Sequence, residues 1–412
     1  MRPFKSPLLI FILVIALTGF GLLMIYSSSA VVAAAQVNHA RSRQLHLGEV
    51  FRPVNQHSLY LQKQLMWLAL GLIAMMYLYA ETDYNKILRR SKWLCLVAFG
   101  LLAAVYLPKI GLKINGARRW IKLGPMTFQP SELAKLVVVI ATAKMLSDRR
   151  DQLRSFGRGF LPPLALGAAF VAMIAVEDLG AAIVLAIIIA MLWFIAGVRI
   201  LHLLALGPIG VAALAAGIAI KPYRLGRIMT FIVSIVQGSS DLTTEIAAKA
   251  WQAKQSLIAV GTGGWTGLGP GMGIQKHYFL PAVYTDYIFA NICEELGFVG
   301  AVALLLLFAM LCFTGFRVAY RSPDFVGALL ISGLTAMIAV PALINVTVVL
   351  GWAPTKGLAL PFISYGGSSL LVNLSAMGLL MNVARRNKET QEVKRPVAVT
   401  PERRLWKWGR AF

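Results

Sequence analysis

Charged residues are scarce in this sequence. They account for 14% of its 412 residues, whereas soluble proteins carry about 25%. Among the charged residues, the acidic ones are the fewer, with 17 Asp and Glu against 40 Lys and Arg. Apolar residues make up 58% of the sequence and gather in long uninterrupted runs. These proportions exclude an ordinary soluble domain, a secreted domain released from a signal peptide, a disordered tail protein and a collagen-like fibre.

Cysteine and histidine are too few and too scattered to indicate a metal centre. The three cysteines, Cys95, Cys293 and Cys312, all fall inside apolar runs, and no two are close in sequence. The five histidines stand singly, without a His-Glu-x-x-His grouping. A metal site built from protein ligands is therefore not predicted, and we interpret the cysteines as small apolar side chains.

The excess of basic residues gives a net charge of +23. Such a charge is typical of nucleic-acid-binding domains, but the apolar runs leave no soluble domain to carry a nucleic-acid surface. No nucleic-acid partner is therefore predicted. The basic residues are better explained as charges that face membrane lipid at the bilayer surfaces and as a binding site for an anionic substrate.

The apolar runs predict an all-α polytopic membrane protein. A membrane helix needs about 20 mostly apolar residues. The first span is expected to be an uncleaved anchor, because its apolar core exceeds the roughly 7–15 residues of a signal peptide. The about ten predicted spans are 8–27, 64–80, 93–108, 132–147, 160–176, 180–197, 201–220, 287–314, 325–346 and 366–383.

Short inner loops that are dense in Lys and Arg predict that both termini are cytoplasmic. The chain would then consist of a membrane domain, 1–383, and a basic cytoplasmic tail, 384–412, that touches anionic lipid. No internal repeat of helix-pair length is evident, so an inverted-repeat transporter has no support in the sequence.

Two long segments, about 28–63 and 221–286, are predicted as outer loops. The second contains an amphipathic stretch, Glu245 to Leu257, which is suited to the membrane interface. It also contains residues 261–273, where seven of thirteen positions are glycine. A nucleotide-binding loop needs a strand before it and a helix after it. Since neither is evident, we interpret the glycines as backbone that lets a large ligand approach closely.

Asp286 ends the second outer loop, at the mouth of the eighth span. One interpretation is a helix N-cap, in which the carboxylate accepts free backbone N–H groups and complements the helix dipole. The other is a general base held at the edge of a membrane cavity. The residues alone favour the cap and leave both interpretations open.

Four further charged residues lie deeper in the spans. Glu294 and Glu295 follow Asp286 by about two helical turns, or roughly 12 Å, and Glu132 and Lys135 are spaced to share one helix face. Unpaired charges are costly at this depth. Either ion pairs between helices or direct contacts with substrate are therefore expected.

Four motifs follow one another along the chain: GARRW…FQPSELAK at 116–135, Glu-Asp-Leu-Gly at 177–180, GTGG…LPAVYTDYIFA…EELGFVGA at 261–301 and PTKGLALPFISYGGSSLL at 354–371. Together they resemble the SEDS family, the shape, elongation, division and sporulation proteins. The similarity covers essentially all ten spans. Pro354-Thr355-Lys356-Gly357 is most similar to the cell-division branch, FtsW, and the elongation branch, RodA, or a sporulation-type member is the near alternative.

The resemblance implies a peptidoglycan glycosyltransferase in the cytoplasmic (inner) membrane. Members of the family polymerise lipid II, a disaccharide-pentapeptide on undecaprenyl pyrophosphate, at the outer membrane face, and the division branch does so at the septum. The implied partners are a cognate class B penicillin-binding protein and other divisome proteins. Asp286 matches the family's essential aspartate, which shifts our preference from the cap to a general base on the acceptor hydroxyl.

The leaving pyrophosphate requires positive charge, from Lys and Arg or from a divalent cation such as Mg²⁺ or Mn²⁺. By their positions in the family motifs, Glu132 is expected to orient Lys135, and Gln129 and Ser364 to contribute hydrogen bonds. The candidate substrate-binding cations are Lys63, Arg119, Lys135, Arg224, Arg227, Lys276 and Lys356.

One departure from the family pattern lies beside the candidate base. Ala282, Val283 and Tyr284 replace the common Glu-Ala-His, which puts the pKa and the activation of Asp286 in question. Two functions of other classes also fit the sequence, a lipid II flippase and a non-catalytic scaffold of the division machinery. Loss of glycan polymer in Asp286→Ala favours the enzyme, whereas lipid II movement that persists in that variant favours the flippase.

Overall fold

The computed structural model describes residues 6–44, 56–108, 110–114, 117–124, 126–219, 224–229, 232, 244–277, 280, 283–354 and 357–393. Within these residues, each of the ten predicted spans coincides with one helix. The ten helices are α1 (Ser6–Gln44), α2 (Gln56–Ala80), α4 (Ser91–Ala104), α5 (Pro130–Asp148), α6 (Leu161–Glu177), α7 (Leu179–Ala196), α8 (Ile200–Ala219), α11 (Ile288–Tyr320), α12 (Phe325–Val349) and α13 (Gly367–Val393).

Eight of the described helices are long and apolar enough to cross a membrane on their own. Of the other two predicted spans, α4 is a shorter apolar helix, and α5 carries Glu132, Lys135 and Lys144. α5 is buried in the bundle, where it packs against α12 and α7, whereas α4 packs against α5 and leaves most of its own side chains at least partly exposed. The prediction of an all-α polytopic membrane protein is confirmed.

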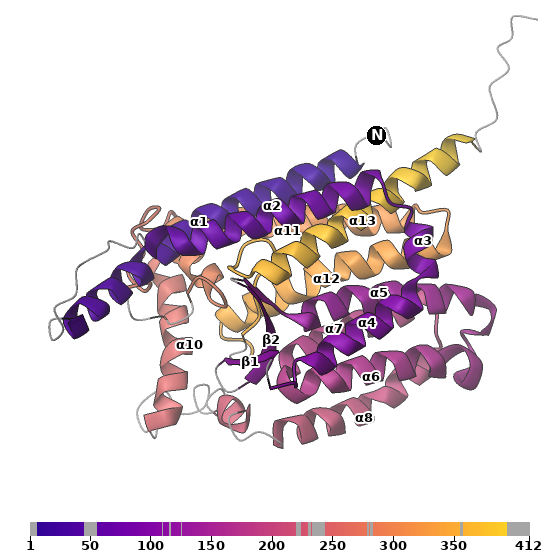
Figure 1. Cartoon of the computed structure of the whole chain (residues 1–412), viewed down its shortest axis with the longest axis horizontal. Coiled ribbons are helices and arrows are strands. Elements are labelled where there is room, and N and C mark those ends of the chain that lie inside the picture. Colours follow the sequence, from indigo (N-terminus) through magenta and orange to yellow (C-terminus); the bar gives the residue numbers. More distant parts are fainter. Residues whose placement is uncertain are drawn as a thin grey trace, which may run out of the picture.

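The long helices run side by side, and their connections gather at two opposite ends (Figure 1). The start of α1, the short helix α3 (Tyr84–Arg89) and the end of α13 lie at one end. A small β-sheet and α10 (Thr244–Thr262) lie towards the other. The first described helix therefore starts on the side of the bundle where the last one ends, as the charge pattern predicted.

The core of the bundle is built around α5 and α12. Most side chains of both helices are buried, and α12 packs against α5, α7, α11 and α13. Two shorter helical turns, Arg150–Gln152 and Phe156–Phe160, connect α5 to α6. These rigid central helices provide the frame on which the outer segments rest.

The structure differs from the loop predictions at three places. The segment 28–63, predicted as an outer loop, is largely helical, because α1 continues to Gln44 and α2 begins at Gln56. The alanines at 33–35 explain the extension of α1, since alanine is the strongest helix former. α13 likewise continues into the predicted tail, to Val393, and α10 occupies the amphipathic part of 221–286.

A three-stranded antiparallel sheet between α4 and α5 was not predicted. It consists of β1 (Gly111–Ile114), β2 (Ala117–Leu123) and β3 (Met126–Phe128), in the order β1-β2-β3. The sequence did contain a signal for it, Asn115-Gly116, because Asn-Gly flanked by short extended runs is typical of hairpins. β2 carries the Arg-Arg pair of the first family motif towards the site described next.

The glycine-rich segment 261–273 packs against the backbone of α11. α11 is kinked at Gly297, which has non-helical dihedral angles (φ 66°). The Glu294 and Glu295 carbonyls accept hydrogen bonds from Leu268 N and Gly269 N, both at 3.0 Å. The close approach that we predicted for a ligand is therefore made by α11 itself.

Candidate active site

Asp286 lies directly before α11, and its side chain is partly buried. The N-cap residue of α11 is Tyr287, and no side-chain hydrogen bond caps the helix. The interpretation of Asp286 as an N-cap is therefore wrong. Among the described residues, no hydrogen bond or ion pair engages its carboxylate, which leaves this group available to a substrate.

Asn345 of α12 fixes the backbone at Asp286. Its Nδ2 donates hydrogen bonds to the carbonyl oxygens of Asp286, at 2.8 Å, and Leu358, at 2.7 Å. Asn345 is buried at 2% exposure near the end of a membrane span, where a polar side chain is costly unless it is paired. The two bonds tie the Asp286 segment and the last outer segment, 350–366, to the rigid core.

Ser364 makes a second tie between the same two segments. Its Oγ donates to the Thr285 carbonyl at 2.5 Å and accepts from Leu360 N at 2.8 Å. Beside it, Tyr365 N donates to the Tyr284 carbonyl at 2.9 Å. We predicted that Ser364 contributes a hydrogen bond to substrate, but the structure places it as a buried brace for the segment that carries Asp286.

The surroundings of Asp286 make it a stronger base than an ordinary aspartate. Burial raises the pKa of its carboxyl group to about 6. The positive charge of Arg227 opposes this rise, the negative charge of Asp178 adds to it, and Arg119 opposes it again. A carboxyl group with a pKa near 6 is still mostly ionised at neutral pH and can accept a proton from a hydroxyl.

Gly357 lies directly against the Asp286 carboxylate. A Cβ atom at residue 357 would lie 2.7 Å from Asp286 Oδ2, closer than a Cβ atom approaches a carboxylate oxygen unless one of the two moves. The absence of a side chain at Gly357 therefore leaves space for the carboxylate. Gly357 also lines a neighbouring groove, so this contact joins the candidate base to the groove.

The groove has a volume of about 410 Å³ and lies between α7, α8 and α12. Its walls are apolar. Wall residues reach from Gly180, at the start of α7, to Ile187, seven residues or about 10 Å deeper in the bundle. A long apolar groove with cations at its outer end suits an amphiphile with an anionic group. The cations that line it are Arg119, Arg224 and Arg227.

Arg119 is held at the groove by the end of α6 and the start of α7. Its Nη1 lies 3.2 Å from Asp178 Oδ2, and its Nε donates to the Glu177 carbonyl at 2.9 Å. Asp178 in turn caps α7 by accepting from Ala181 N at 3.0 Å. The Arg119 side chain keeps 30% exposure, so it can also contact a ligand in the groove.

The two arginines of residues 224–229 differ in their surroundings. Arg224 is buried and donates to the carbonyls of Ala175, Val176 and Gly217, the last residues of α6 and α8. Arg224 therefore links the C-terminal ends of α6 and α8 by hydrogen bonds. Arg227 is partly buried, lines the groove and acts electrostatically on Asp286.

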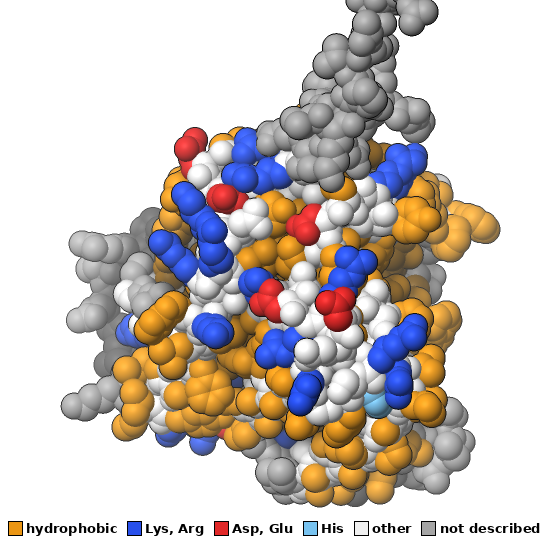
Figure 2. Space-filling view, turned by 90° about the vertical axis from the view of Figure 1, so that its right-hand side faces the viewer, with side chains coloured by type: hydrophobic (Ala, Val, Ile, Leu, Met, Phe, Trp, Pro, Cys, Tyr) orange, Lys and Arg blue, Asp and Glu red, His pale blue; other side chains and the backbone are white. Residues whose placement is uncertain are grey.

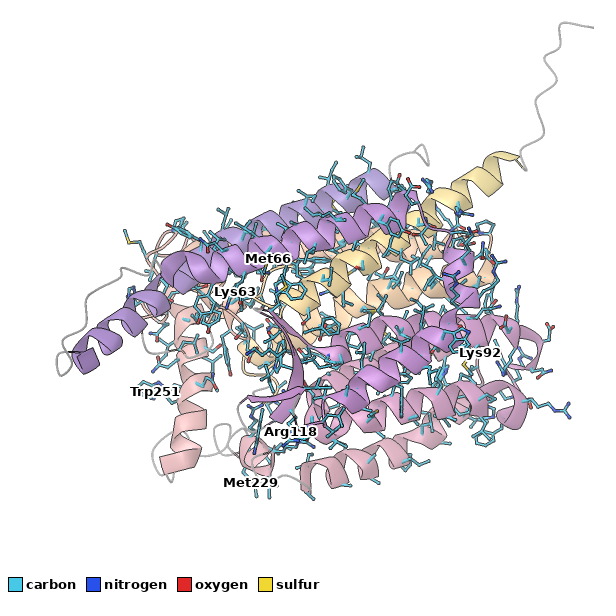
Figure 3. The ribbon with its side chains drawn as sticks, viewed as in Figure 1. Lys63, Met66, Lys92, Arg118, Met229 and Trp251 are labelled. Carbon is cyan, nitrogen blue, oxygen red and sulfur yellow. The ribbon has the colours of Figure 1, made fainter. Side chains whose placement is uncertain are left out.

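The remaining predicted site residues lie outside this groove. Lys135 is paired with Glu132 at 2.8 Å, and both side chains are buried; this ion pair lies within α5 and not between two helices. Gln129 is the N-cap residue of α5. Figure 3 shows Lys63 on α2, exposed and away from Arg118 of β2. Lys356, like Ala282, lies outside the described residues.

Lys276 is buried at 3% exposure in a polar cluster between α1 and α11. Its Nζ contacts Glu295 Oε1 at 2.7 Å, the Gly271 carbonyl at 2.7 Å and Ser27 Oγ at 3.1 Å. An ammonium group has three N–H donors, so none remains for a phosphate. Glu294 completes the cluster by accepting from the backbone N–H groups at 274 and 275. This cluster anchors the glycine-rich segment.

Replacing Lys276 with Met is expected to destabilise the protein strongly. The substitution would leave the buried Glu295 carboxylate without its ion-pair partner, which typically costs about 3–5 kcal/mol. The measurement is thermal unfolding of the purified protein in detergent, with Lys254→Met, at an exposed position of α10, as the control. Equal unfolding temperatures for the two variants would contradict the structural role of Lys276.

Sequence analysis missed three residues of the site. Asp178 lay in a quoted motif without a role, Asn345 is the one side-chain amide in an apolar span, and Gly357 lay in the last motif. The Asn in an apolar span was the detectable signal, because a strongly polar side chain at membrane depth is costly unless it has a partner or a function. Among the described residues, no three His, Cys, Asp or Glu side chains form a group that could hold a metal ion.

Comparison with known proteins agrees with the four motifs. The family model described as "Cell cycle protein", which groups FtsW, RodA and SpoVE, matches residues 7–389. Stage V sporulation protein E of Bacillus subtilis (strain 168) is 37% identical over 385 residues, 93% of this chain and 98% of that protein. A probable peptidoglycan glycosyltransferase FtsW of Geobacter sp. (strain M18) is 35% identical over 380 residues, 92% and 96% of the two chains.

One solved structure has the same fold. It is described as the structural coordination of polymerization and crosslinking by a peptidoglycan synthase complex. Its matching chain superposes on this chain with a TM-score of 0.71 at 28% sequence identity. The match covers 92% of this chain and 97% of that chain. With its four motifs, a described helix at each of the ten predicted spans, and matches along almost its whole length, this chain belongs to the FtsW/RodA/SpoVE family of cell cycle proteins.

Proposed function

We propose that this protein is a peptidoglycan glycosyltransferase that polymerises lipid II into glycan strands. The observation that carries the proposal is the position of Asp286. Its carboxylate, which has no hydrogen bond or ion pair within the described part of the chain and a pKa raised to about 6, lies against Gly357 at the edge of an apolar groove lined by Arg119 and Arg227. The FtsW relative and the solved structure reported above, which are named for peptidoglycan synthesis, support the same activity.

The groove accounts for the three parts of a lipid-linked sugar. Its apolar walls fit the polyprenyl chain, and the guanidinium groups of Arg119 and Arg227 fit the pyrophosphate. The sugars would then lie beside Asp286. The acceptor C4 hydroxyl attacks C1 of the donor sugar, the bond between C1 and the pyrophosphate oxygen breaks, and the hydroxyl proton passes to the carboxylate.

The Asp286 carboxylate and the two arginines lower the activation barrier of polymerisation in different ways. Proton removal by a positioned carboxylate contributes about 10²–10⁴-fold, and cations that face the leaving pyrophosphate stabilise its developing charge. The described residues offer no cluster of protein ligands for Mg²⁺ or Mn²⁺. We therefore assign the pyrophosphate contacts to the two arginines and derive no step from a divalent ion.

The rate of polymerisation is expected to fall as the pH drops through 6. Asp286 must be ionised to accept the proton, and its pKa of about 6 means that about one tenth of it is ionised at pH 5, against most of it at pH 7. The rate at pH 5 should therefore be about tenfold below its neutral plateau. Initial rates between pH 5 and pH 8, with unfolding followed at each pH, test this. A flat profile in folded protein contradicts the assignment.

We further propose a place for the enzyme in the cell. The cell-division motif at 354–357 and the FtsW relatives support action at the division septum, with the groove and Asp286 on the outer membrane face. The matching complex, which couples polymerization to crosslinking, supports a class B penicillin-binding protein as partner. Imaging of a tagged copy in dividing cells tests the septal position.

A reconstitution experiment separates this function from its alternatives. The purified protein is placed in vesicles with lipid II, with and without a class B penicillin-binding protein, and glycan strands are resolved on gels. Polymer in either condition supports the glycosyltransferase. Transbilayer movement of lipid II without any polymer would instead indicate a flippase, and recruitment of the partner without either activity would indicate a scaffold.

A further inference from the structure

A second large cavity lies at the end of the bundle opposite Asp286. It has a volume of about 680 Å³ and is formed by α3, α4, α5, α6 and the turn after α5. Figure 3 places Lys92, one of its lining residues, at the end of the molecule away from Lys63 and Trp251. The proposed polymerisation uses no part of this cavity.

Positive charge dominates the rim of the cavity. Arg89, Lys92, Lys144 and Arg149 line it, against one carboxylate, Asp148. Figure 2 views this end of the molecule and shows Lys and Arg side chains spread across it, with few acidic ones between them. The positive potential at the cavity therefore attracts an anion.

Only part of this charge is neutralised by the protein. Asp148 pairs with Lys144 at 2.5 Å, and Arg149 makes a long contact with the Met145 carbonyl at 3.4 Å. For Arg89 and Lys92, the described part of the chain provides no side-chain hydrogen bond or ion pair. Both side chains are exposed, so they can close on a ligand from the rim.

The floor of the cavity is apolar and reaches into the membrane-spanning part of the bundle. Cys95 lies one helical turn beyond Ser91 on α4, and Ala141 and Leu166 face it from α5 and α6. The outer surface of α4 beside the cavity is also apolar, with Trp93 at 70% exposure, and tryptophan at this depth is typical of the lipid headgroup level.

We propose that this cavity binds an anionic phospholipid from the membrane leaflet opposite Asp286. The phosphate would lie between Arg89 and Lys92, and the acyl chains would leave over the apolar floor and the surface of α4. A basic cavity between membrane helices at the bilayer surface is the known setting for such headgroups. A free phosphate ion would use the rim but gain nothing from the apolar floor, so the lipid should bind more tightly.

The test compares lipid binding by charge-matched variants. Purified wild type, Arg89→Gln/Lys92→Gln and Lys86→Gln/Arg90→Gln are equilibrated with vesicles of phosphatidylglycerol or of phosphatidylcholine, and bound lipid is counted by native mass spectrometry. Lys86 and Arg90 are exposed neighbours that do not line the cavity. Loss of both rim charges should weaken phosphatidylglycerol binding about 30-fold, at about 1 kcal/mol per basic residue, and the control pair should bind like wild type.

A competition arm distinguishes the lipid from free phosphate. Inorganic phosphate at millimolar concentration should not displace the bound phosphatidylglycerol. The proposal is overturned if phosphate displaces the lipid fully, if phosphatidylcholine binds as tightly as phosphatidylglycerol, or if both double variants lose lipid equally. All four exchanged side chains are exposed, so both double variants should unfold at the wild-type temperature. The exchange Arg89→Lys/Lys92→Arg keeps both rim charges and should keep binding, which separates loss of charge from misfolding.

Discussion

Asp286→Asn should abolish glycan synthesis while leaving the protein folded. The amide keeps the size of the carboxylate but cannot accept the hydroxyl proton, so we expect a loss of about 10²–10⁴-fold in polymerisation rate. Because burial raises the pKa of Asp286 to about 6, the ionised carboxylate costs folding energy at neutral pH, and the variant should unfold at the same or a higher temperature.

The stability comparison has a definite pH dependence. The pKa of Asp286 is higher in the folded protein, about 6, than its ordinary value of 3.8. The cost of ionisation is therefore fully present above pH 6 and disappears as the pH falls below about 4, where the carboxyl group is protonated in both states. Any advantage of Asp286→Asn in unfolding temperature should shrink over that range. If the variant is both inactive and unfolded, misfolding explains the loss of activity, and this account is contradicted.

Gly357→Ala should impair catalysis without breaking the fold. The new Cβ would lie 2.7 Å from Asp286 Oδ2, about 0.7 Å inside an ordinary contact distance, so the short carboxylate side chain must turn away. Misplacement of a reacting group by about 1 Å can cost about 10²-fold. We expect a loss of about 10- to 100-fold in the polymerisation rate, with little change in the affinity for lipid II.

Gly366→Ala is the matched control for Gly357→Ala. Gly366 belongs to the same outer segment, but its nearest neighbour for an added Cβ is Ser369 Cβ at 3.7 Å, an ordinary contact. This variant should retain near wild-type rates. If both substitutions slow polymerisation equally, the segment as a whole is sensitive to change, and the specific contact between Gly357 and the base is not the cause.

Hydropathy was sufficient to predict the helical frame of this protein. All ten spans were predicted because an apolar run of bilayer length has few alternatives to a helix. The sheet of β1 to β3 was missed because its strands are only three to seven residues long and lie between two spans. The resemblance to a family led to Asp286 as the candidate base, whereas the residues alone had favoured a cap.

The roles of the basic residues could not be predicted from the sequence. Lys276 and Arg119 both occur in family motifs beside apolar spans, yet one is buried in a structural cluster and the other lines the groove. The difference lies in their distant partners. Ser27, which contacts Lys276, is 249 residues away, and Glu177, which holds Arg119, is 58 residues away. Spacing along one chain does not reveal which helix faces which.

The most direct test of the central claim is a structure of Asp286→Asn with lipid II bound. The account predicts the polyprenyl chain between α7, α8 and α12, the pyrophosphate at Arg119 and Arg227, and a sugar hydroxyl within about 3 Å of residue 286. A headgroup bound elsewhere, with residue 286 out of reach of every sugar hydroxyl, would show that this carboxylate is not the base.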